Sequence, residues 1–101
     1  MKIVITKHAH ERMILRDITN ADIIAAVKDK NKGVKKNKHG VNITSLNKKT
    51  GNTLMCGVKA DVKNNTLTIK TCMYREIDNT PANMNDNRSK YADVRGYAIT
   101  I

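Results

Sequence analysis

The first pattern in the chain is a helical one that covers residues 7–16. Ala9, Met13 and Ile14 recur at the spacing of one helix face, at about 3.6 residues per turn. The opposite face carries one histidine and two arginines at i, i+4 and i+8, which are His8, Arg12 and Arg16. Thr6 precedes the stretch and is a suitable N-cap. The pattern predicts an amphipathic helix that presents its basic face outward.

A second helical pattern follows at once, over residues 20–30. Thr19 and Asp22 have the spacing of a capping box, in which each side chain binds the backbone N–H of the other residue. The apolar stripe of this helix consists of Ile23, Ile24, Ala26 and Val27. Only a few residues separate the two helices, so they form a corner. Such corners are mostly structural and do not by themselves indicate DNA binding.

The middle of the chain alternates apolar and polar residues with the period of β-strands. The three alternating runs cover residues 41–47, 53–62 and 66–74. Two polar turns separate them, and Gly51 stands where the first turn needs a left-handed residue. The runs predict an antiparallel meander with the helices on one face, so the sequence predicts an α+β fold. In it, two N-terminal helices pack on a three- to four-stranded antiparallel sheet in a single domain.

The two ends of the chain are harder to assign. Residues 2–6 indicate a short strand or an extended lead-in, while residues 78–95 are polar and rich in asparagine. An apolar alternation resumes over residues 97–101, which leaves open whether the end returns as an extra strand. We therefore divide the chain into an α+β unit, 1–77, and a polar C-terminal segment, 78–101. Within the last predicted strand, strict alternation sets Leu67, Ile69, Thr71 and Met73 on one face and Thr68, Lys70, Cys72 and Tyr74 on the other.

The charge balance indicates an anionic partner. The chain has 101 residues with 19 basic against 9 acidic ones, a formal net charge of +10. Nucleic acid is the first candidate partner and an acidic protein the second. No apolar run approaches the roughly 20 residues that a membrane span needs, and no signal peptide is visible, so we expect a cytoplasmic protein without membrane contact.

The cysteines carry little chemical information. Cys56 and Cys72 fall in two of the strand runs, with no C-x-x-C and no Cys/His metal spacing. We expect two buried free thiols on neighbouring strands. We expect neither a metal site nor a cofactor.

The most basic stretch of the chain covers residues 28–38. It can be a solvated loop, a lysine-rich strand edge that opposes aggregation, or a loop that follows a phosphate backbone, and its density favours phosphate contact. The predicted nucleic-acid contacts are the basic residues here and in the later turns, namely Lys28, Lys32, Lys35, Lys36, Lys38, Lys48, Lys49 and Arg75.

The two helical stretches also resemble a known family. His8-Ala9-x-Glu11-Arg12-Met13-x-x-Arg16-x-Ile18-Thr19, followed by Asp22-Ile23, Ala26-Val27 and Gly33, is similar to the opening of the DUF4258 domains. The resemblance extends over residues 5–74. It departs from the family pattern at Asp17, where the family has glycine after its second arginine, so the turn between the helices can differ.

The resemblance implies a compact α+β domain related to the RelE, BrnT, barnase and colicin-type ribonuclease folds. It implies metal-independent RNA cleavage of toxin type, with His8, Arg12 and Arg16 carried over from the motif. Tyr74 and Arg75 end the closing strand, where such toxins place an active residue. Histidine can move protons near neutral pH, and arginine can bind the charge of the transition state.

The second proton carrier stays open between Tyr74 and His39. The alternatives to the ribonuclease are a non-catalytic nucleic-acid-binding protein and a small phage or mobile-element inhibitor of an acidic host factor. RNA is the expected partner, with an acidic antitoxin or immunity protein as a further candidate. Only three aromatic residues, all tyrosines, are present to stack on bases.

Overall fold

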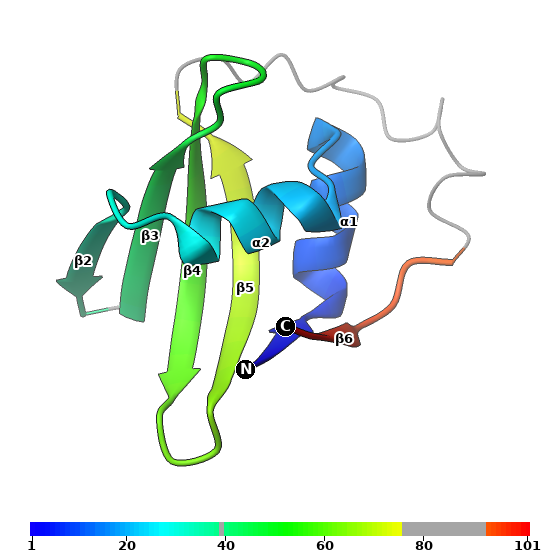
Figure 1. Cartoon of the computed structure of the whole chain (residues 1–101). Coiled ribbons are helices and arrows are strands. Elements are labelled where there is room, and N and C mark those ends of the chain that lie inside the picture. Colours follow the sequence, from blue (N-terminus) through cyan, green and yellow to red (C-terminus); the bar gives the residue numbers. More distant parts are fainter. Residues whose placement is uncertain (39, 76–92) are drawn as a thin grey trace.

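Two capped helices and six strands make up this computed structural model, which describes residues 1–38, 40–75 and 93–101. The elements in chain order are β1 (Lys2–Ile5), α1 (Lys7–Arg16), α2 (Asn20–Lys28), β2 (Gly33–Asn37), β3 (Gly40–Leu46), β4 (Thr53–Asp61), β5 (Thr66–Tyr74) and β6 (Tyr97–Thr100). The strands form one sheet in the order β2-β3-β4-β5-β1-β6. Both helices lie against this sheet, as Figure 1 shows.

Local capping explains where α1 and α2 begin and end. The Thr6 hydroxyl accepts a hydrogen bond from the N–H of Ala9 at 3.1 Å, and Thr19 and Asp22 form the predicted capping box. Asp17 ends α1 in a left-handed conformation, with φ at 55°, which is the role that glycine usually takes. Asp29 is extended and ends α2 at Lys28, two residues earlier than predicted.

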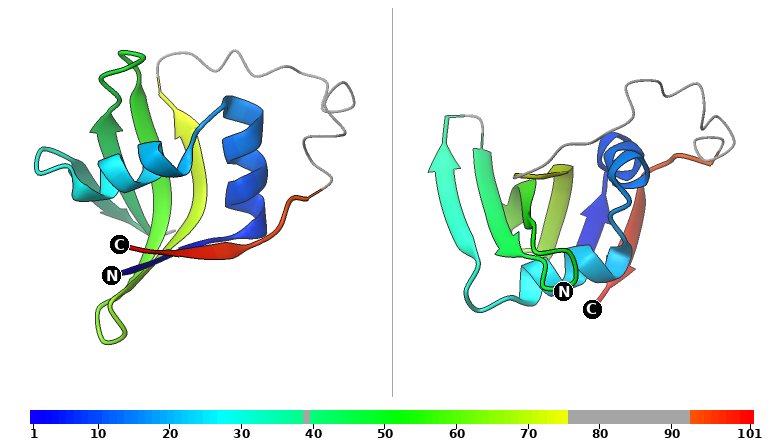
Figure 2. Two further views of the ribbon diagram at one scale, coloured as in Figure 1. Left: turned by 45° about the vertical axis from the view of Figure 1, so that its right-hand side comes forward. Right: turned by 90° about the horizontal axis from the view of Figure 1, so that it is seen from above.

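The prediction of a three- to four-stranded antiparallel sheet is wrong. The sheet has six strands and is mixed, because β1 runs parallel to β5 while its other neighbour, β6, is antiparallel. The meander β3-β4-β5 forms as predicted. Both ends of the chain extend it: the N-terminal strand inserts between β5 and the C-terminal strand. Figure 2 shows the two termini side by side, and the Met1 amine donates to the Ile101 carbonyl at 2.9 Å.

The remaining strand, β2, lies in the most basic stretch of the chain, residues 28–38. All five of its residues are exposed, and it pairs with β3 at the end of the strand order, so it is an edge strand of the described sheet. A Cβ on Gly33 would lie 2.5 Å from the Thr44 hydroxyl oxygen, so glycine permits the close approach of the two strands. Of the alternatives for residues 28–38, the lysine-rich edge therefore describes residues 33–37. Residues 33–37 show no apolar alternation because neither face of this strand is buried.

A β-bulge corrects the predicted faces of β5. Gly57 pairs with Thr71, but the next residue, Val58, pairs with Ile69, so Lys70 is the extra residue of the bulge. The extra residue shifts the alternation by one position. Leu67, Ile69 and Cys72 are consequently all buried, although strict alternation separated the first two from Cys72.

One face of the sheet carries the core. Cys72 lies on this face opposite Cys56, and its thiol is 3.9 Å from the Ala9 carbonyl oxygen of α1. Ser45, on the same face of β3, bonds to the end of α2, so both helices cover one side. Both cysteines are buried and free, as predicted. On the other face, Met73 is 40% exposed.

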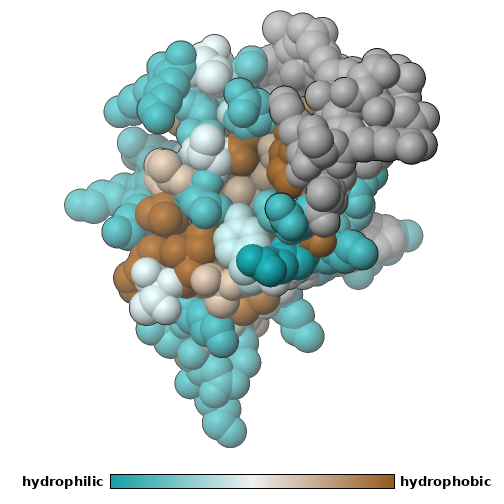
Figure 3. Space-filling view, turned by 90° about the vertical axis from the view of Figure 1, so that its right-hand side faces the viewer, coloured by the Kyte–Doolittle hydropathy of each residue, from teal (hydrophilic) through white to brown (hydrophobic). Residues whose placement is uncertain are grey.

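On the side of the molecule that carries α1 and β6, several apolar residues are only partly buried. Tyr97, Ile99 and Ile101 are only partly buried against the core, as are Ile24 and Val27 of α2. Figure 3 shows hydrophobic side chains gathered on this side, with hydrophilic ones around them. No helix in the described ranges is long and apolar enough to cross a membrane.

Candidate functional site

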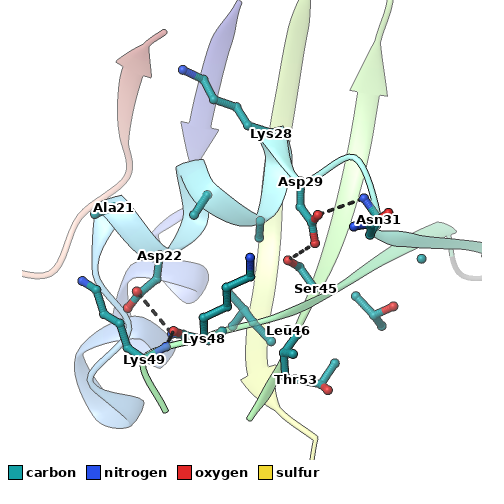
Figure 4. A pocket seen from close by; sticks show the side chains of 16 residues that line it. Ala21, Asp22, Lys28, Asp29, Asn31, Ser45, Leu46, Lys48, Lys49 and Thr53 are labelled. Carbon is teal, nitrogen blue, oxygen red and sulfur yellow. Dashed lines mark hydrogen bonds between the residues drawn. The ribbon is translucent and has the colours of Figure 1, made fainter. Parts of the chain in front are cut away.

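A cavity of about 940 Å³ opens between α2 and the adjoining ends of β3 and β4. The walls are α2, the turn that follows it, β3, the β3–β4 loop and the start of β4 (Figure 4). On the helix side, Ala21 and Ala25 line it, one helical turn apart, and their small side chains leave the space open. Leu54, which pairs with Ser45 on the helix-covered face of the sheet, lines the opposite side. The size lies within the usual range of ligand pockets, roughly 300–1,000 Å³.

A hydrogen-bonded carboxylate forms one wall of the cavity. The Ser45 hydroxyl donates to Oδ2 of Asp29 at 2.7 Å, and the backbone N–H of Asn31 donates to Oδ1 at 2.8 Å. These two bonds, the serine bond first, lower the pKa of Asp29 below its ordinary value. Asp29 is therefore a carboxylate at neutral pH, and each of its oxygens keeps capacity to accept a further bond.

A second polar group connects the cavity to the end of β5. Asn47 Nδ2 lies 3.3 Å from Oδ1 of Asp22 and 3.2 Å from the Tyr74 hydroxyl oxygen. Burial is the main cause that raises the pKa of Tyr74. Tyr74 is therefore a neutral phenol at physiological pH, held behind Asn47 at the edge of the cavity.

Three of the predicted nucleic-acid contacts come together at this cavity. Lys28 ends α2, and Lys48 and Lys49 lie in the β3–β4 loop, yet all three line the same opening. In Figure 4, Lys48 extends from the loop toward α2, and its charge also lowers the pKa of Asp29. Asp22 and Asp29, the carboxylates of the cavity, already accept hydrogen bonds from neutral groups. Lys28, Lys48 and Lys49 thus form a basic rim around the opening, next to two carboxylates that already accept hydrogen bonds.

The other predicted contacts lie around this rim. The Lys32 ammonium group donates a hydrogen bond to the backbone carbonyl of Asp29 at 3.2 Å, beside the cavity. Lys35 and Lys36 are exposed on β2, on opposite faces of the edge strand, and Lys38 is exposed in the turn that follows. Arg75 directly follows β5 and its side chain is exposed. Its backbone N–H donates to the carbonyl of Thr53, a residue that lines the cavity.

The four predicted catalytic residues do not converge. His8 is exposed in the first turn of α1, whereas Arg16 lies in the last turn, about 12 Å further along the axis at 1.5 Å per residue. Arg16 is half-buried and donates to the Cys72 carbonyl at 3.4 Å, so the prediction that it faces outward is wrong. Arg12 is half-buried. Tyr74 lies near the Arg16 end of the helix, beyond Cys72 on β5, and so away from His8.

His39, the other candidate proton carrier, lies outside the described residues, as do residues 76–92, the end of the α+β unit and the first part of the C-terminal segment. Within the ranges that are described, no three His, Cys, Asp or Glu side chains group closely enough to hold a metal ion.

Sequence reasoning missed the polar wall of the cavity. Asp29 stood out only as the single acid among six lysines of residues 28–38, and nothing local linked it to Ser45, 16 positions later. One signal was present: Ser45 continues the inward alternation of Val41 and Ile43. A serine in such a register needs a hydrogen-bond partner inside the fold, and the partner is Asp29.

In comparisons with known proteins, no family model, no curated protein and no solved structure matches this chain. The DUF4258 resemblance therefore stays a prediction.

Proposed function

We propose that this chain binds single-stranded RNA through the basic rim of the cavity, without cutting it. The observation that carries the proposal is the meeting of Lys28 with Lys48 and Lys49 at one opening. Their ammonium groups can form charge-assisted hydrogen bonds with phosphate oxygens, while the neighbouring aspartates accept hydrogen bonds from neutral donors. The net charge of +10 supplies long-range attraction to a polyanion.

A binding role fits the geometry better than the predicted ribonuclease. Metal-free cleavage needs an acid and a base within hydrogen-bond reach of the same phosphate. His8 and Tyr74 lie toward opposite ends of α1, and Arg16 is engaged with a backbone carbonyl. The toxin-type ribonuclease stays a prediction, to be judged by the same experiment.

We also propose, from the matching helix residues, that the resemblance to DUF4258 reflects kinship in α1 and α2, and that the protein works in the cytoplasm. Two free thiols fit a reducing compartment. An acidic antitoxin or immunity protein would compete for the same lysines.

Fluorescence anisotropy with a labelled RNA of about 12 nucleotides tests the proposal. Affinity should fall steeply between roughly 50 and 200 mM salt, with a log–log slope of about −0.7 per phosphate neutralised. Replacing Lys28, Lys48 and Lys49 by alanine should make the slope less steep by about 2. The matched control replaces Lys2, Lys59 and Lys63, which are exposed at the far end of the sheet, near the β4–β5 turn.

If both triple variants lose the same amount of RNA affinity, the binding depends on the overall positive charge and not on the basic rim. A salt-independent complex, or binding of an acidic protein in place of RNA, would overturn the proposal. Gel analysis of the same RNA after incubation with chelator tests the nuclease: cleavage that depends on His8 would establish the ribonuclease instead.

A further inference from the structure

The cavity has the two kinds of surface that a nucleotide base requires. Its floor is apolar, with Ala21, Ala25 and Ala26 from α2 and Leu54 from β4. Leu54 pairs with Ser45 and lies on the sheet face that the helices cover. The row of small alanines beside Leu54 leaves a slot for a flat apolar body. The chain has few aromatic residues, so a slot of this kind would take the place of a stacking platform.

The wall of the slot is an acceptor-only group. Asp29 is held by Ser45 at 2.7 Å and by the N–H of Asn31 at 2.8 Å, one bond on each carboxylate oxygen. An ionised carboxylate has about four acceptor positions, so both oxygens can accept from a ligand at once. Two adjacent donors satisfy this arrangement best. Of the common bases, only guanine presents two N–H donors side by side on its Watson–Crick edge, at N1 and N2.

The other bases meet this wall less well. Adenine and cytosine each offer one amino donor next to a ring acceptor, which would face a carboxylate oxygen. Uracil offers one N–H between two carbonyl acceptors. A carboxylate opposed to an acceptor is left without a partner, and each such mismatch costs binding energy.

The mouth of the slot is cationic. Lys48 and Lys49 follow each other in the β3–β4 loop, and both line the cavity. Their amines can reach a phosphate at the opening, while a base on the same nucleotide lies deeper, against Asp29. Lys28 lies on the α2 side of the opening, and in Figure 4 it extends away from Asp29.

We propose that this cavity binds one guanine nucleotide of an RNA strand, with the base against the α2 alanines and Leu54, its N1–H and N2–H donating to Asp29, and its phosphate at Lys48 and Lys49. The inference rests on the proposed RNA binding and names the subsite that this binding would use. It assigns base selectivity to Asp29 and base-independent affinity to the two lysines.

Titration calorimetry with the four nucleoside 5′-monophosphates tests the inference directly. Guanosine monophosphate should bind more tightly than the other three by about tenfold, since a good bidentate contact is worth roughly 1–3 kcal/mol. Asp29→Asn should reduce the preference to within about twofold, because an amide presents one donor and one acceptor. The matched control is Asp61→Asn, since the Asp61 carboxylate is likewise hydrogen-bonded, to Asn64, but is exposed and lies outside the cavity.

Two further variants keep the test decisive. The double variant Lys48→Ala, Lys49→Ala should lower the affinity for guanosine monophosphate but not for guanosine, since only the former carries the phosphate. Ala25→Leu fills the slot from an exposed helix position, and should lower the affinity for both ligands while the melting temperature stays unchanged. This variant answers the question even if Asp29→Asn fails to fold.

The outcomes separate this inference from the proposed function. Salt-dependent RNA binding with equal affinities for all four nucleotides overturns the guanine subsite and leaves the RNA-binding function standing. Guanosine monophosphate binding without RNA binding supports the subsite and overturns the function. No change in nucleotide affinity in Asp29→Asn and Ala25→Leu overturns the subsite under either condition.

Discussion

The Ser45 hydroxyl donates a hydrogen bond to Oδ2 of Asp29 at 2.7 Å, across 16 positions of the chain. Ser45 is 7% exposed, the buried polar residue of β3, and Asp29 is the residue that ends α2. The bond therefore fixes the C-terminal end of the helix to the sheet. It also fixes the carboxylate that forms the wall of the cavity, so one contact serves both the fold and the proposed site.

This bond should make stability depend on pH in the acid range. The pKa of Asp29 is lowered in the folded chain, so its carboxylate stabilises the fold above its ordinary pKa of 3.8. That contribution is lost as the pH falls through the lowered value. Ser45→Ala should destabilise the protein more at pH 7 than near pH 2, by urea unfolding at both pH values. In an Asp29→Asn background, the same substitution should cost equal amounts at both, and an unequal cost there would contradict the assignment.

Short-range signals predicted α1, α2 and the meander, and the structure explains why. Each helix begins at a threonine cap whose partner lies three positions away, and each hairpin turn is encoded by adjacent residues. Such contacts are visible in the sequence because both partners fall within one window. Gly51, at a φ of 73°, takes the left-handed position that its turn predicted.

Long-range pairing decided the rest. The parallel pairing of Ile3 with Leu67 joins positions far apart, and no local pattern indicates which strands become neighbours. The edge strand β2 has no buried face, and the bulge at Lys70 reverses the alternation within β5. The cavity depends on the same long-range contacts. Its lysines were predicted from charge density, whereas Asp29 became part of a site only through Ser45.

The conformation of Asp17 predicts a stabilising substitution. Asp17 ends α1 with φ at 55° and ψ at 43°, a region that costs most L-residues roughly 1–2 kcal/mol, although aspartate tolerates it better. Its carboxylate also lies at the negative end of the helix dipole. Asp17→Gly should raise the free energy of unfolding by roughly 0.5–1 kcal/mol. Asp17→Ala, which keeps the Cβ, is the control. In thermal unfolding, it should raise the free energy of unfolding less than Asp17→Gly does. An equal increase in both variants would assign the effect to the lost charge alone.

The two thiols should be slow to react in the folded protein. Burial raises the pKa of Cys56 to about 12 and that of Cys72 to about 11, so little thiolate is present at pH 8. A disulfide-exchange reagent at pH 8 should modify neither group on the time scale of minutes in native buffer, and both at once in denaturant. Rapid modification of one thiol in the native protein would show that β4 and β5 open locally.

The two histidines of α1 should differ in what their loss costs. His8 is exposed in the first turn, so His8→Ala should leave the melting temperature nearly unchanged. His10 is half-buried; its Nδ1 lies 3.0 Å from the Arg95 carbonyl oxygen, and its ring meets Tyr97 edge-on at 4.9 Å between centroids. These contacts hold β6 and the residues before it against α1. His10→Ala should therefore cost roughly 1–2 kcal/mol, from one hydrogen bond and one aromatic pair.

Hydrogen exchange locates the effect of His10→Ala. Because β6 pairs with β1 at the end of the strand order of the described sheet, loss of its tether should lower protection in β6 first, while β3 and β4 stay protected. Tyr97→Leu is the complementary variant: it removes the aromatic contact with His10 and the hydrogen bond from the Tyr97 hydroxyl to Asn20, so it should also lower protection in β6. Equal destabilisation by His8→Ala and His10→Ala would contradict the role of the Arg95 and Tyr97 contacts, because His8 shares neither of them.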